Sequence, residues 1–463
     1  MARASILLER IEPPSRADTL EGTPPSGSVS PQLEDGCNIA LHPSRHEFSL
    51  PPMDGGKDAW LFLAAGFVFE ALVWGFPYSF GVFQDYYTTT PPFAGSPNIA
   101  VIGTCAMGLM YLLSPLTLGI CRVYARQARY APVAGMLIMC AALVASSFCT
   151  TVNGLVATQG VLYAVGGSVA YSPCMLYIDE WFAARKGLAY GIMWAGTGLA
   201  GVVLPLLLES LLGRLGYQTT LRLWSGILFA CTAPLAWFIK PRIPVSASSA
   251  SRSRPWDLRF WGLKAFLCYQ FCNVVEAMGF FLPTIYLPTF ARSALNAGAL
   301  TSASTILLVN VASVFGTVAM GWLIDRFHVT TCICISTVGC VLGVFCVWGL
   351  STSLATLYAF CILYGLFAGS FVGSWPGVMK EVASIGADEY GYIDPAMVFG
   401  WLAAGRGIGN VVSGPLSGVL LSSGSGWKAG GGYGSGYGGL IVFTGVTALV
   451  GGTSWIWRRV GFL

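Results

Sequence analysis

The sequence has few charged residues for its length. Asp, Glu, Lys and Arg make up 10% of the 463 residues, whereas soluble domains carry about 25% of these types. So few charges cannot cover a soluble surface, which excludes an ordinary soluble domain. The net charge is only +4 and the basic residues form no stripe, so a nucleic-acid partner is not expected.

Patterns typical of cofactor sites are also missing. The three histidines, His42, His46 and His328, form no cluster, and no two of the 14 cysteines have the CxxC spacing of a metal or redox site. GTGLAG at 196–201 matches a dinucleotide-binding pattern, but it lies inside a membrane-length apolar run and no strand precedes it. We therefore expect no metal and no other cofactor.

Long apolar runs are abundant instead. Hydrophobic residues make up 55% of the chain, and about 20 apolar residues suffice for a helix to span a bilayer. The runs predict an all-α integral membrane protein with twelve transmembrane helices, embedded in the lipid bilayer. They lie at 60–83, 98–121, 131–149, 154–177, 187–212, 221–239, 260–290, 300–323, 329–350, 353–378, 396–421 and 439–457.

The distribution of Lys and Arg predicts the orientation. If the N-terminus is cytoplasmic, the loops and tail on that side hold thirteen Lys or Arg residues and the opposite loops hold four. Excess positive charge marks the cytoplasmic side, so both termini are expected there. Residues 1–56, rich in Pro, Ser and Gly, are expected to be a disordered cytoplasmic segment. The plasma membrane is the default location for this multi-pass protein, with a vacuolar or other internal membrane as the alternative.

Two sequence matches at nearly equal offsets indicate an internal repeat. Glu70 and Pro77 in the first span match Glu276 and Pro283 in the seventh, at an offset of 206. AGTGLAGVV at 195–203 matches AGRGIGNVV at 404–412, at an offset of 209. This arrangement resembles the major facilitator fold, with two pseudo-symmetric six-helix halves at 57–240 and 259–463 joined by a cytoplasmic linker at 241–258.

Three short segments carry a closer resemblance. GWLIDR at 321–326 resembles the cytoplasmic loop motif of the major facilitator superfamily. DGG at 54–56 and WFAARKGLAYGIMWAGTGLAGVVLP at 181–205 resemble the signature segments of its monocarboxylate porter family. The resemblance implies a conformational latch, to which we assign Arg185, Lys186, Asp325 and Arg326; the alternative for Asp325 and Arg326 is a solvated turn. The loop after the second span, GICRVYARQAR, has no Asp, which leaves open whether the first half forms such a latch.

Charged residues inside spans are costly, about 2.5 to 3.5 kcal/mol each on insertion scales, so each needs a partner or a water-lined cavity. Glu70, Glu276 and Arg406 are the informative ones. Arg406 is expected to bind an anionic or polar substrate group; the alternatives are an ion pair with one of the glutamates, or a place at a helix end. A glutamate that loses its partner as the cavity opens would also couple transport to protons.

Aromatic and amide groups at similar depth complete the predicted substrate site, although each could equally serve in plain packing. They are Tyr78, Trp194, Asn273, Tyr286 and Trp375.

The sequence departs from the lactate-type monocarboxylate porters. Tyr78 follows the Phe76–Pro77 pair where those proteins have Lys, and the eighth span has no charge. The chain looks more like the fungal branch of the family, of which many members are thought to export secondary metabolites. The resemblance implies a secondary active transporter, not an enzyme, that moves a small organic acid or polar aromatic metabolite by alternating access, in the efflux direction. Uptake of a monocarboxylate or vitamin is the closest alternative, followed by a membrane nutrient sensor that transports nothing.

Overall fold

The computed structural model describes residues 50–96, 98–244, 256–424 and 429–461. These residues belong to one compact unit, Leu50–Leu463. Every regular element in them is helical, in agreement with the all-α prediction. Most of the predicted disordered segment, and most of the predicted linker, lie outside the described residues.

The N-terminal helices, α1 to α8, begin with a segment that changes its helical type. A π-helical turn, η1, follows α1 directly, and α2 and α3 continue along the same path. The bounds are α1 Lys57–Phe69, η1 Glu70–Trp74, α2 Gly75–Tyr78, α3 Phe80–Thr89, α4 Ile99–Val123, η2 Ala128–Tyr130, α5 Ala131–Ser146, α6 Val152–Leu155, η3 Val156–Leu162, α7 Tyr163–Trp181, α8 Lys186–Thr232 and η4 Leu235–Phe238.

The C-terminal helices are α9 to α16. Pro283 and Pro288 lie inside α9 without ending it, because neighbouring groups in a membrane bundle can satisfy the carbonyls that a proline leaves free. The bounds are η6 Arg259–Gly262, α9 Lys264–Leu295, α10 Ala299–Ile324, α11 Val329–Leu342, η7 Gly343–Trp348, α12 Leu354–Phe367, η8 Phe371–Ser374, α13 Trp375–Tyr390, α14 Pro395–Gly424, η9 Gly431–Gly434, α15 Gly438–Gly451 and α16 Ser454–Arg459.

Ten helical segments among the described residues are long and apolar enough to cross a membrane. One of them, Lys186–Phe238, holds two of the predicted spans, and Gly216 within it has non-helical backbone angles. The predicted eleventh span corresponds to α14, which has 30 residues and is not among the ten. All twelve predicted apolar runs therefore coincide with helices.

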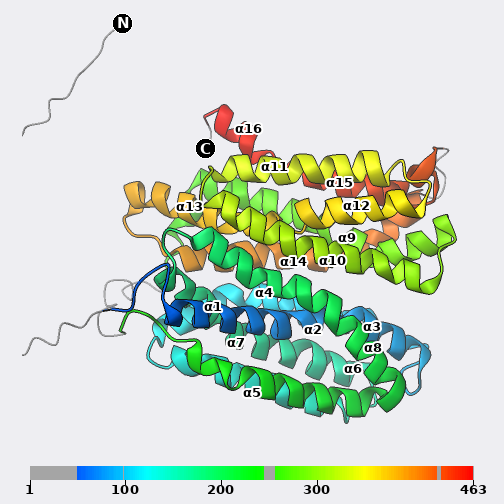
Figure 1. Cartoon of the computed structure of the whole chain (residues 1–463), viewed down its shortest axis with the longest axis horizontal. Helices are drawn as coiled ribbons and strands as arrows, with labels where there is room; N and C mark the ends of the chain where they lie inside the picture. Colours follow the sequence, from blue (N-terminus) through cyan, green and yellow to red (C-terminus); the bar gives the residue numbers. More distant parts are fainter. Residues whose placement is uncertain (1–49, 97, 245–255, 425–428, 462–463) are drawn as a thin grey trace, which may run out of the picture. The chain divides into compact units, whose positions relative to one another are not determined.

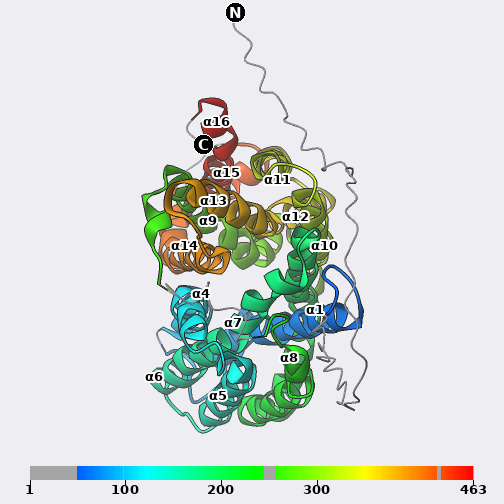
Figure 2. The same cartoon turned by 90° about the vertical axis from the view of Figure 1, so that its left-hand side faces the viewer.

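The helices run side by side, with the N-terminal helices below and most C-terminal helices above in Figure 1. Asp54 precedes α1, Arg122 lies in the last turn of α4, Asp325 follows α10 and Asp394 precedes α14, and we call the end of the bundle that they share the latch end. In Figure 1 this end is on the left, where α1 begins. The opposite end, where α9 finishes near Arg292, is called the Arg292 end. Figure 2 faces the latch end and shows α10 beside α8, and α4 beneath α14.

Glycines allow α8 and α10 to approach closely. A Cβ atom on Gly187 would lie 2.4 Å from the Gly321 carbonyl oxygen, and one on Gly191 would lie 2.6 Å from that of Thr317. Further along, Gly198 and Gly201 lie against Val314 and Asn310. Any larger residue at the first two positions would push the backbones apart, so the small-residue face of α8 permits the contact between N-terminal and C-terminal helices.

Candidate functional site: a central cavity closed at the latch end

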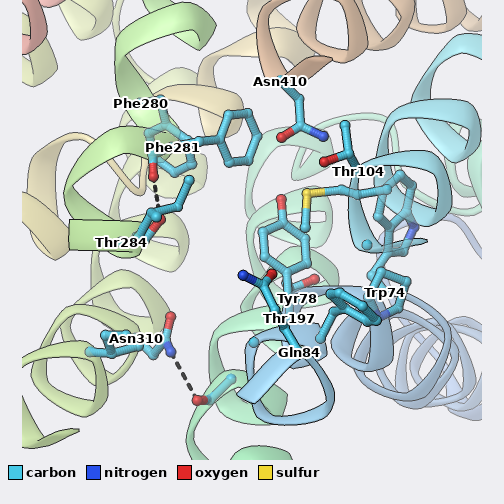
Figure 3. Close-up of a pocket in the computed structure, with 18 of the residues that line it drawn as sticks. Trp74, Tyr78, Gln84, Thr104, Thr197, Phe280, Phe281, Thr284, Asn310 and Asn410 are labelled. Atoms are coloured by element: carbon cyan, nitrogen blue, oxygen red, sulfur yellow. Dashed lines mark hydrogen bonds between the residues drawn. The ribbon is translucent and has the colours of Figure 1, made fainter. Parts of the chain in front are cut away.

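A cavity of about 1660 Å³ lies between the N-terminal and C-terminal helices. Its wall comes from η1, α2 to α4, α7 to α10 and α12 to α14, and it extends from mid-bundle to Asp85 and Thr89 on α3 and Arg292 on α9. Figure 3 shows aromatic and amide side chains facing each other across it, with Tyr78 and Trp74 on one side and Phe280 and Phe281 on the other. Such a mixed wall suits a molecule with both apolar and polar parts.

Glu70 lies at the start of the π-helical turn, on the cavity wall. It is only 5% exposed, and one carboxyl oxygen accepts a hydrogen bond from the Thr197 hydroxyl of α8. The other oxygen, Oε2, has no hydrogen-bond partner among the described residues. Gly196 brings α8 close, since a Cβ atom there would lie 2.5 Å from the Phe67 carbonyl oxygen. π-helical turns are frequent at functional sites, so the local backbone and the buried acid point to the same place.

Glu276 and Arg406 form a buried ion pair. The Arg406 Nη1 lies 3.0 Å from Glu276 Oε2, and the Arg406 side chain is 1% exposed. Its guanidinium also lies 4.2 Å from the centre of the Phe280 ring. Arg406 lines the cavity, whereas Glu276 lies behind it. Of the three predicted roles for Arg406, the ion pair is the arrangement present in this conformation.

The two acids occupy matching places in the repeat. Glu70 bonds to Thr197, and Glu276 bonds to Arg406. Glu70 corresponds to Glu276 at an offset of 206, and Thr197 corresponds to Arg406 at an offset of 209. The same contact is therefore built twice, with a cation as partner for one acid and a neutral hydroxyl for the other.

Two tyrosines and an aromatic cluster shape the deep part of the cavity. The Tyr78 and Tyr111 hydroxyls are 2.9 Å apart and share a hydrogen bond. Toward the latch end, the rings of Trp194, Trp375 and Phe399 pack together with centroids 5.6 to 6.1 Å apart. All five residues line the cavity. The three packed rings come from α8, α13 and α14, so they close the cavity floor between the N-terminal and C-terminal helices.

Six of the eight predicted substrate residues line the cavity: Glu70, Tyr78, Trp194, Tyr286, Trp375 and Arg406. Asn273 and Glu276 do not. Asn273 is 2% exposed and donates a hydrogen bond of 2.7 Å to the Leu402 carbonyl oxygen, so it joins α9 to α14. Tyr286 shares a hydrogen bond of 2.8 Å with Ser417.

Asp325 connects the end of α10 to the start of α8. Its carboxylate oxygens accept hydrogen bonds from the backbone N–H groups of Gly187 and Leu188, at 2.6 and 2.9 Å. A carboxylate at a helix N-terminus satisfies free N–H groups and meets the positive end of the helix dipole. Burial raises the pKa of Asp325, these two hydrogen bonds act to lower it, and the nearby charge of Asp54 raises it further.

Asp54, from the DGG segment, holds the loop that precedes α8. Its carboxylate accepts hydrogen bonds of 2.9 to 3.0 Å from the backbone N–H groups of Ala183, Ala184 and Arg185. Burial acts to raise the pKa of Asp54, but these bonds and the Arg185 charge outweigh it, so the pKa lies below its usual value. The two segments that resemble monocarboxylate porters are thus in direct contact.

The other predicted latch residues have different contacts. Lys186 pairs with Asp179 at 3.0 Å. Arg185 bonds to Asp54 through its backbone N–H, and the Arg326 guanidinium lies over the Trp322 ring. Of the four predicted latch residues, Asp325 makes the hydrogen bonds that join α10 to α8.

Sequence reasoning missed the second contact at this end. Arg122, at the end of α4, donates two hydrogen bonds to Asp394, which precedes α14. A polar contact between α4 and the start of α14 therefore exists although the loop after α4 lacks Asp. Tyr111 and Asn410 of the cavity were also missed, because polar residues inside apolar runs are common. Thr197 was identifiable, since it matches Arg406 in the repeat.

Comparison with known proteins gives consistent results. The family model "Major Facilitator Superfamily" matches residues 62–393. The "MFS-type transporter hasB" of Aspergillus fumigatus is 27% identical, over 87% of this chain and 89% of that protein. The "Aspyridones efflux protein apdF" of Emericella nidulans is 26% identical, over 82% of this chain and 76% of that protein. The "Fujikurins efflux protein" of Gibberella fujikuroi is 25% identical, over 97% of this chain and 93% of that protein.

Two solved structures share the fold. The nucleoside transporter NupG has a TM-score of 0.56 at 16% identity, covering 87% of this chain and 100% of that one. The human organic anion transporter MFSD10 (TETRAN) has a TM-score of 0.61 at 14% identity, covering 85% of this chain and 98% of that one. They confirm the predicted fold class.

Proposed function

Because the chain belongs to the major facilitator superfamily, we propose that it exports a secondary metabolite by alternating access. Members of this family are transporters and not enzymes, as the sequence predicted. The names of two similar fungal proteins, the aspyridones and fujikurins efflux proteins, support export over uptake. The observation that carries the proposal is the central cavity, which is closed at the latch end and reaches the Arg292 end.

The cavity favours a substrate with aromatic and polar parts, of the organic-acid or polar aromatic class. Its volume of about 1660 Å³ exceeds the roughly 300 to 1,000 Å³ of ordinary ligand pockets. Arg406 lies on the wall but is already paired with Glu276, so an acidic substrate group would have to share the guanidinium. Tyr78, Asn310 and Asn410 add neutral hydrogen-bonding groups to the cavity wall.

Glu70 is the proposed proton carrier. It has no cationic partner within 4.0 Å among the described residues, whereas Glu276 has Arg406. An unpaired carboxylate is costly in a membrane interior, so Glu70 should hold a proton in this conformation and release it when water reaches it. The titratable groups that interact with it are Tyr171 and Cys174 of α7, Tyr78 of α2 and Tyr111 of α4. Arg406 interacts with Tyr78 and Tyr111.

Two further assignments complete the proposal. The contact of Asp54 with the loop before α8 supports kinship with monocarboxylate porters, because it joins both signature segments. Repeat-matched contacts at Glu70 and Glu276 support two six-helix halves at 57–240 and 259–463. The Lys and Arg distribution supports a cytoplasmic latch end and cytoplasmic termini, with the plasma membrane as the proposed location.

The test compares metabolites inside and outside the source cells. The gene is left intact, deleted, or restored as wild type, Arg406→Ala or the control Arg214→Ala, which changes an exposed arginine outside the cavity wall. A compound that accumulates inside cells with the deletion or Arg406→Ala, but not with Arg214→Ala, supports export through this cavity. A nutrient left outside the same cells would establish uptake instead. Unchanged pools in every strain would reject transport and favour the sensor.

A further inference from the structure

Three arginines at the latch end lie over tryptophan rings. The guanidinium carbon of Arg326 is 3.9 Å from the centre of the Trp322 ring, that of Arg459 is 4.9 Å from Trp455, and that of Arg129 is 5.3 Å from Trp237. All three arginines are exposed. A cation above an indole face is attracted by the electrons of the ring, so each pair holds its guanidinium in place.

These guanidinium groups have no carboxylate partner within 4.0 Å among the described residues. Arg122 and Arg259 at the same end differ, because they pair with Asp394 and Asp257. A guanidinium that lies over a ring can keep the N–H groups at its edge available, and their fork matches the oxygens of a phosphate. The three arginines are therefore positioned to accept an anion.

The tryptophans are exposed to an unusual degree for large aromatic residues. Trp237, Trp322 and Trp455 are 70%, 42% and 38% exposed. Each lies near the end of an apolar helical segment, where a transmembrane protein meets the lipid headgroups. An indole ring with a polar edge is well suited to that zone, so each arginine is expected to lie at the level of the headgroups.

The three pairs lie on different sides of the bundle. Arg129 precedes α5, Trp322 lies in the last turns of α10, and Trp455 belongs to α16. In Figure 2, which faces this end, α5 is at the bottom, α10 at the right and α16 at the top. The three pairs are therefore separate sites, an arrangement that suits individual lipid molecules around the bundle.

We propose that the Arg129–Trp237, Arg326–Trp322 and Arg459–Trp455 pairs bind the phosphate groups of anionic phospholipids in the leaflet at the latch end. The proposal is independent of what the cavity carries. Arg326 directly follows Asp325, so a lipid bound there would also hold the end of α10 beside the start of α8. Anionic lipid should therefore favour the conformation that is closed at this end.

The experiment measures lipid selectivity of the full chain in vesicles. The protein is reconstituted in phosphatidylcholine, with a trace of spin-labelled phosphatidylserine or spin-labelled phosphatidylcholine, and the immobilised fraction of each is recorded. We expect wild type to prefer the labelled phosphatidylserine. Since each basic residue near an anionic surface contributes on the order of a fivefold preference, Arg129→Gln/Arg326→Gln/Arg459→Gln should abolish most of that selectivity.

A matched pair of variants distinguishes lipid binding at the Arg–Trp pairs from the general attraction of anionic lipid to any exposed arginine. Arg126→Gln removes an exposed arginine from the same loop as Arg129, but one with no indole ring beneath it in the part of the chain that the structure describes. Arg129→Gln removes one of three separate sites and should lower the preference by about one third of the loss seen in the triple variant, whereas Arg126→Gln should leave it nearly unchanged. Trp237→Leu keeps the charges of Arg126 and Arg129 but removes the indole ring, so it should also lower the preference for phosphatidylserine. Equal losses for Arg126→Gln and Arg129→Gln would overturn the proposal.

Two controls cover folding and free anions. Arg129→Lys/Arg326→Lys/Arg459→Lys keeps the charge but loses the planar fork, so it should recover part of the selectivity in a folded protein. Inorganic phosphate at millimolar concentration should not displace the labelled phosphatidylserine. Full displacement by free phosphate would identify a general anion site and would reject the lipid assignment.

Discussion

Arg122 and Asp394 are joined by two hydrogen bonds, of 2.7 and 2.9 Å, although 272 residues separate them. Asp394 also accepts a hydrogen bond from the backbone N–H of Ala396 at the start of α14. On the other side of the bundle, Asp325 binds the start of α8 directly. Both contacts place a carboxylate at a helix N-terminus. Asp325 comes from the end of the neighbouring helix α10, whereas Asp394 comes from the loop that directly precedes the helix it caps, α14.

This arrangement predicts that the Arg122 and Asp394 charges can be exchanged. Arg122→Asp or Asp394→Arg alone should place like charges together and weaken closure at the latch end. The double exchange should recover part of it, although an arginine at position 394 cannot cap α14. A double-mutant cycle on the thermal unfolding midpoint should give a coupling of about 1.5 to 3 kcal/mol, as for charged hydrogen bonds. Strictly additive single changes would contradict the prediction.

The crossing of α8 and α10 predicts a steric effect. A Cβ atom on Gly321 would lie 2.2 Å from the Gly187 carbonyl oxygen, and this oxygen belongs to the backbone and cannot turn away. Gly321→Ala should therefore destabilise the latched conformation by about 1 to 3 kcal/mol, the usual cost of overpacking. Labelling of a cysteine introduced on the cavity floor, from the latch end, should become faster.

Gly226→Ala is the matched control for this change. Gly226 also lies in α8, and a Cβ atom there would meet nothing within 4 Å. Its labelling rate should equal that of wild type, and its unfolding midpoint should not fall. Slow labelling in Gly321→Ala would show that the close approach is not needed for closure.

The Glu276–Arg406 pair can be tested for structural and transport roles separately. Glu276→Met alone leaves a buried guanidinium without its partner, which should cost about 3 to 5 kcal/mol of stability. Glu276→Met/Arg406→Met removes both charges and should restore most of that stability. If the double variant folds but loses transport, Arg406 serves the substrate as well as the fold. A double variant with normal flux would reduce the pair to a structural element.

Asp54 predicts a dependence of stability on pH. Its pKa in the folded chain lies below the usual 3.8, so the ionised form stabilises the loop before α8. A carboxylate with a depressed pKa contributes stability above its unfolded pKa and loses it as the pH falls through the folded pKa. The difference in unfolding midpoint between wild type and Asp54→Asn should be constant from pH 7 to about pH 5 and shrink below about pH 4. A difference that grows on acidification would refute this sign.

Asn is a suitable replacement at position 54 for a second reason. Asp54 has a φ of 55°, in the left-handed region, and Asn tolerates that region nearly as well as Asp does. The comparison with Asp54→Asn therefore isolates the charge from backbone strain. Asp54→Ala, by contrast, should lose additional stability that does not change with pH.

The sequence predicted the helices well because membrane spans are defined by local composition. Runs of apolar residues with breaks at Gly, Pro and charge are visible without any tertiary information, and all twelve coincide with helices. Charge inside an apolar run singled out Glu70, Glu276 and Arg406, and the internal offset matched Glu70 with Glu276 and Thr197 with Arg406, whose contacts correspond. What local patterns could not reveal was pairing at a distance.

Asp394 and Asn273 illustrate the limit. Asp394 lies in an ordinary polar loop, and only the packing of α4 beside α14 brings Arg122 to it. Asn273 is a polar residue inside an apolar span, as expected of a residue that faces a cavity. Its side chain instead donates a hydrogen bond to the Leu402 carbonyl oxygen. The face that a helix turns to the cavity depends on how the helix is rotated relative to its neighbours. A helix that is apolar on all sides has no sequence pattern from which this rotation can be predicted.

The loop before α8 and the first turn of α8 are held through backbone hydrogen bonds to two aspartates. Five peptide N–H groups between Ala183 and Leu188 meet the carboxylates of Asp54 and Asp325, and neither acid hydrogen-bonds a side chain there. A peptide N–H is the same for nearly every amino acid, so this stretch has wide latitude to diverge among related transporters. Substitutions should accumulate at Ala183 and Ala184 while the two distant aspartates, and the glycine at 187 that admits α10, stay fixed. Conservation would then mark the residues that contact segment 183–188 more clearly than most residues of the segment itself.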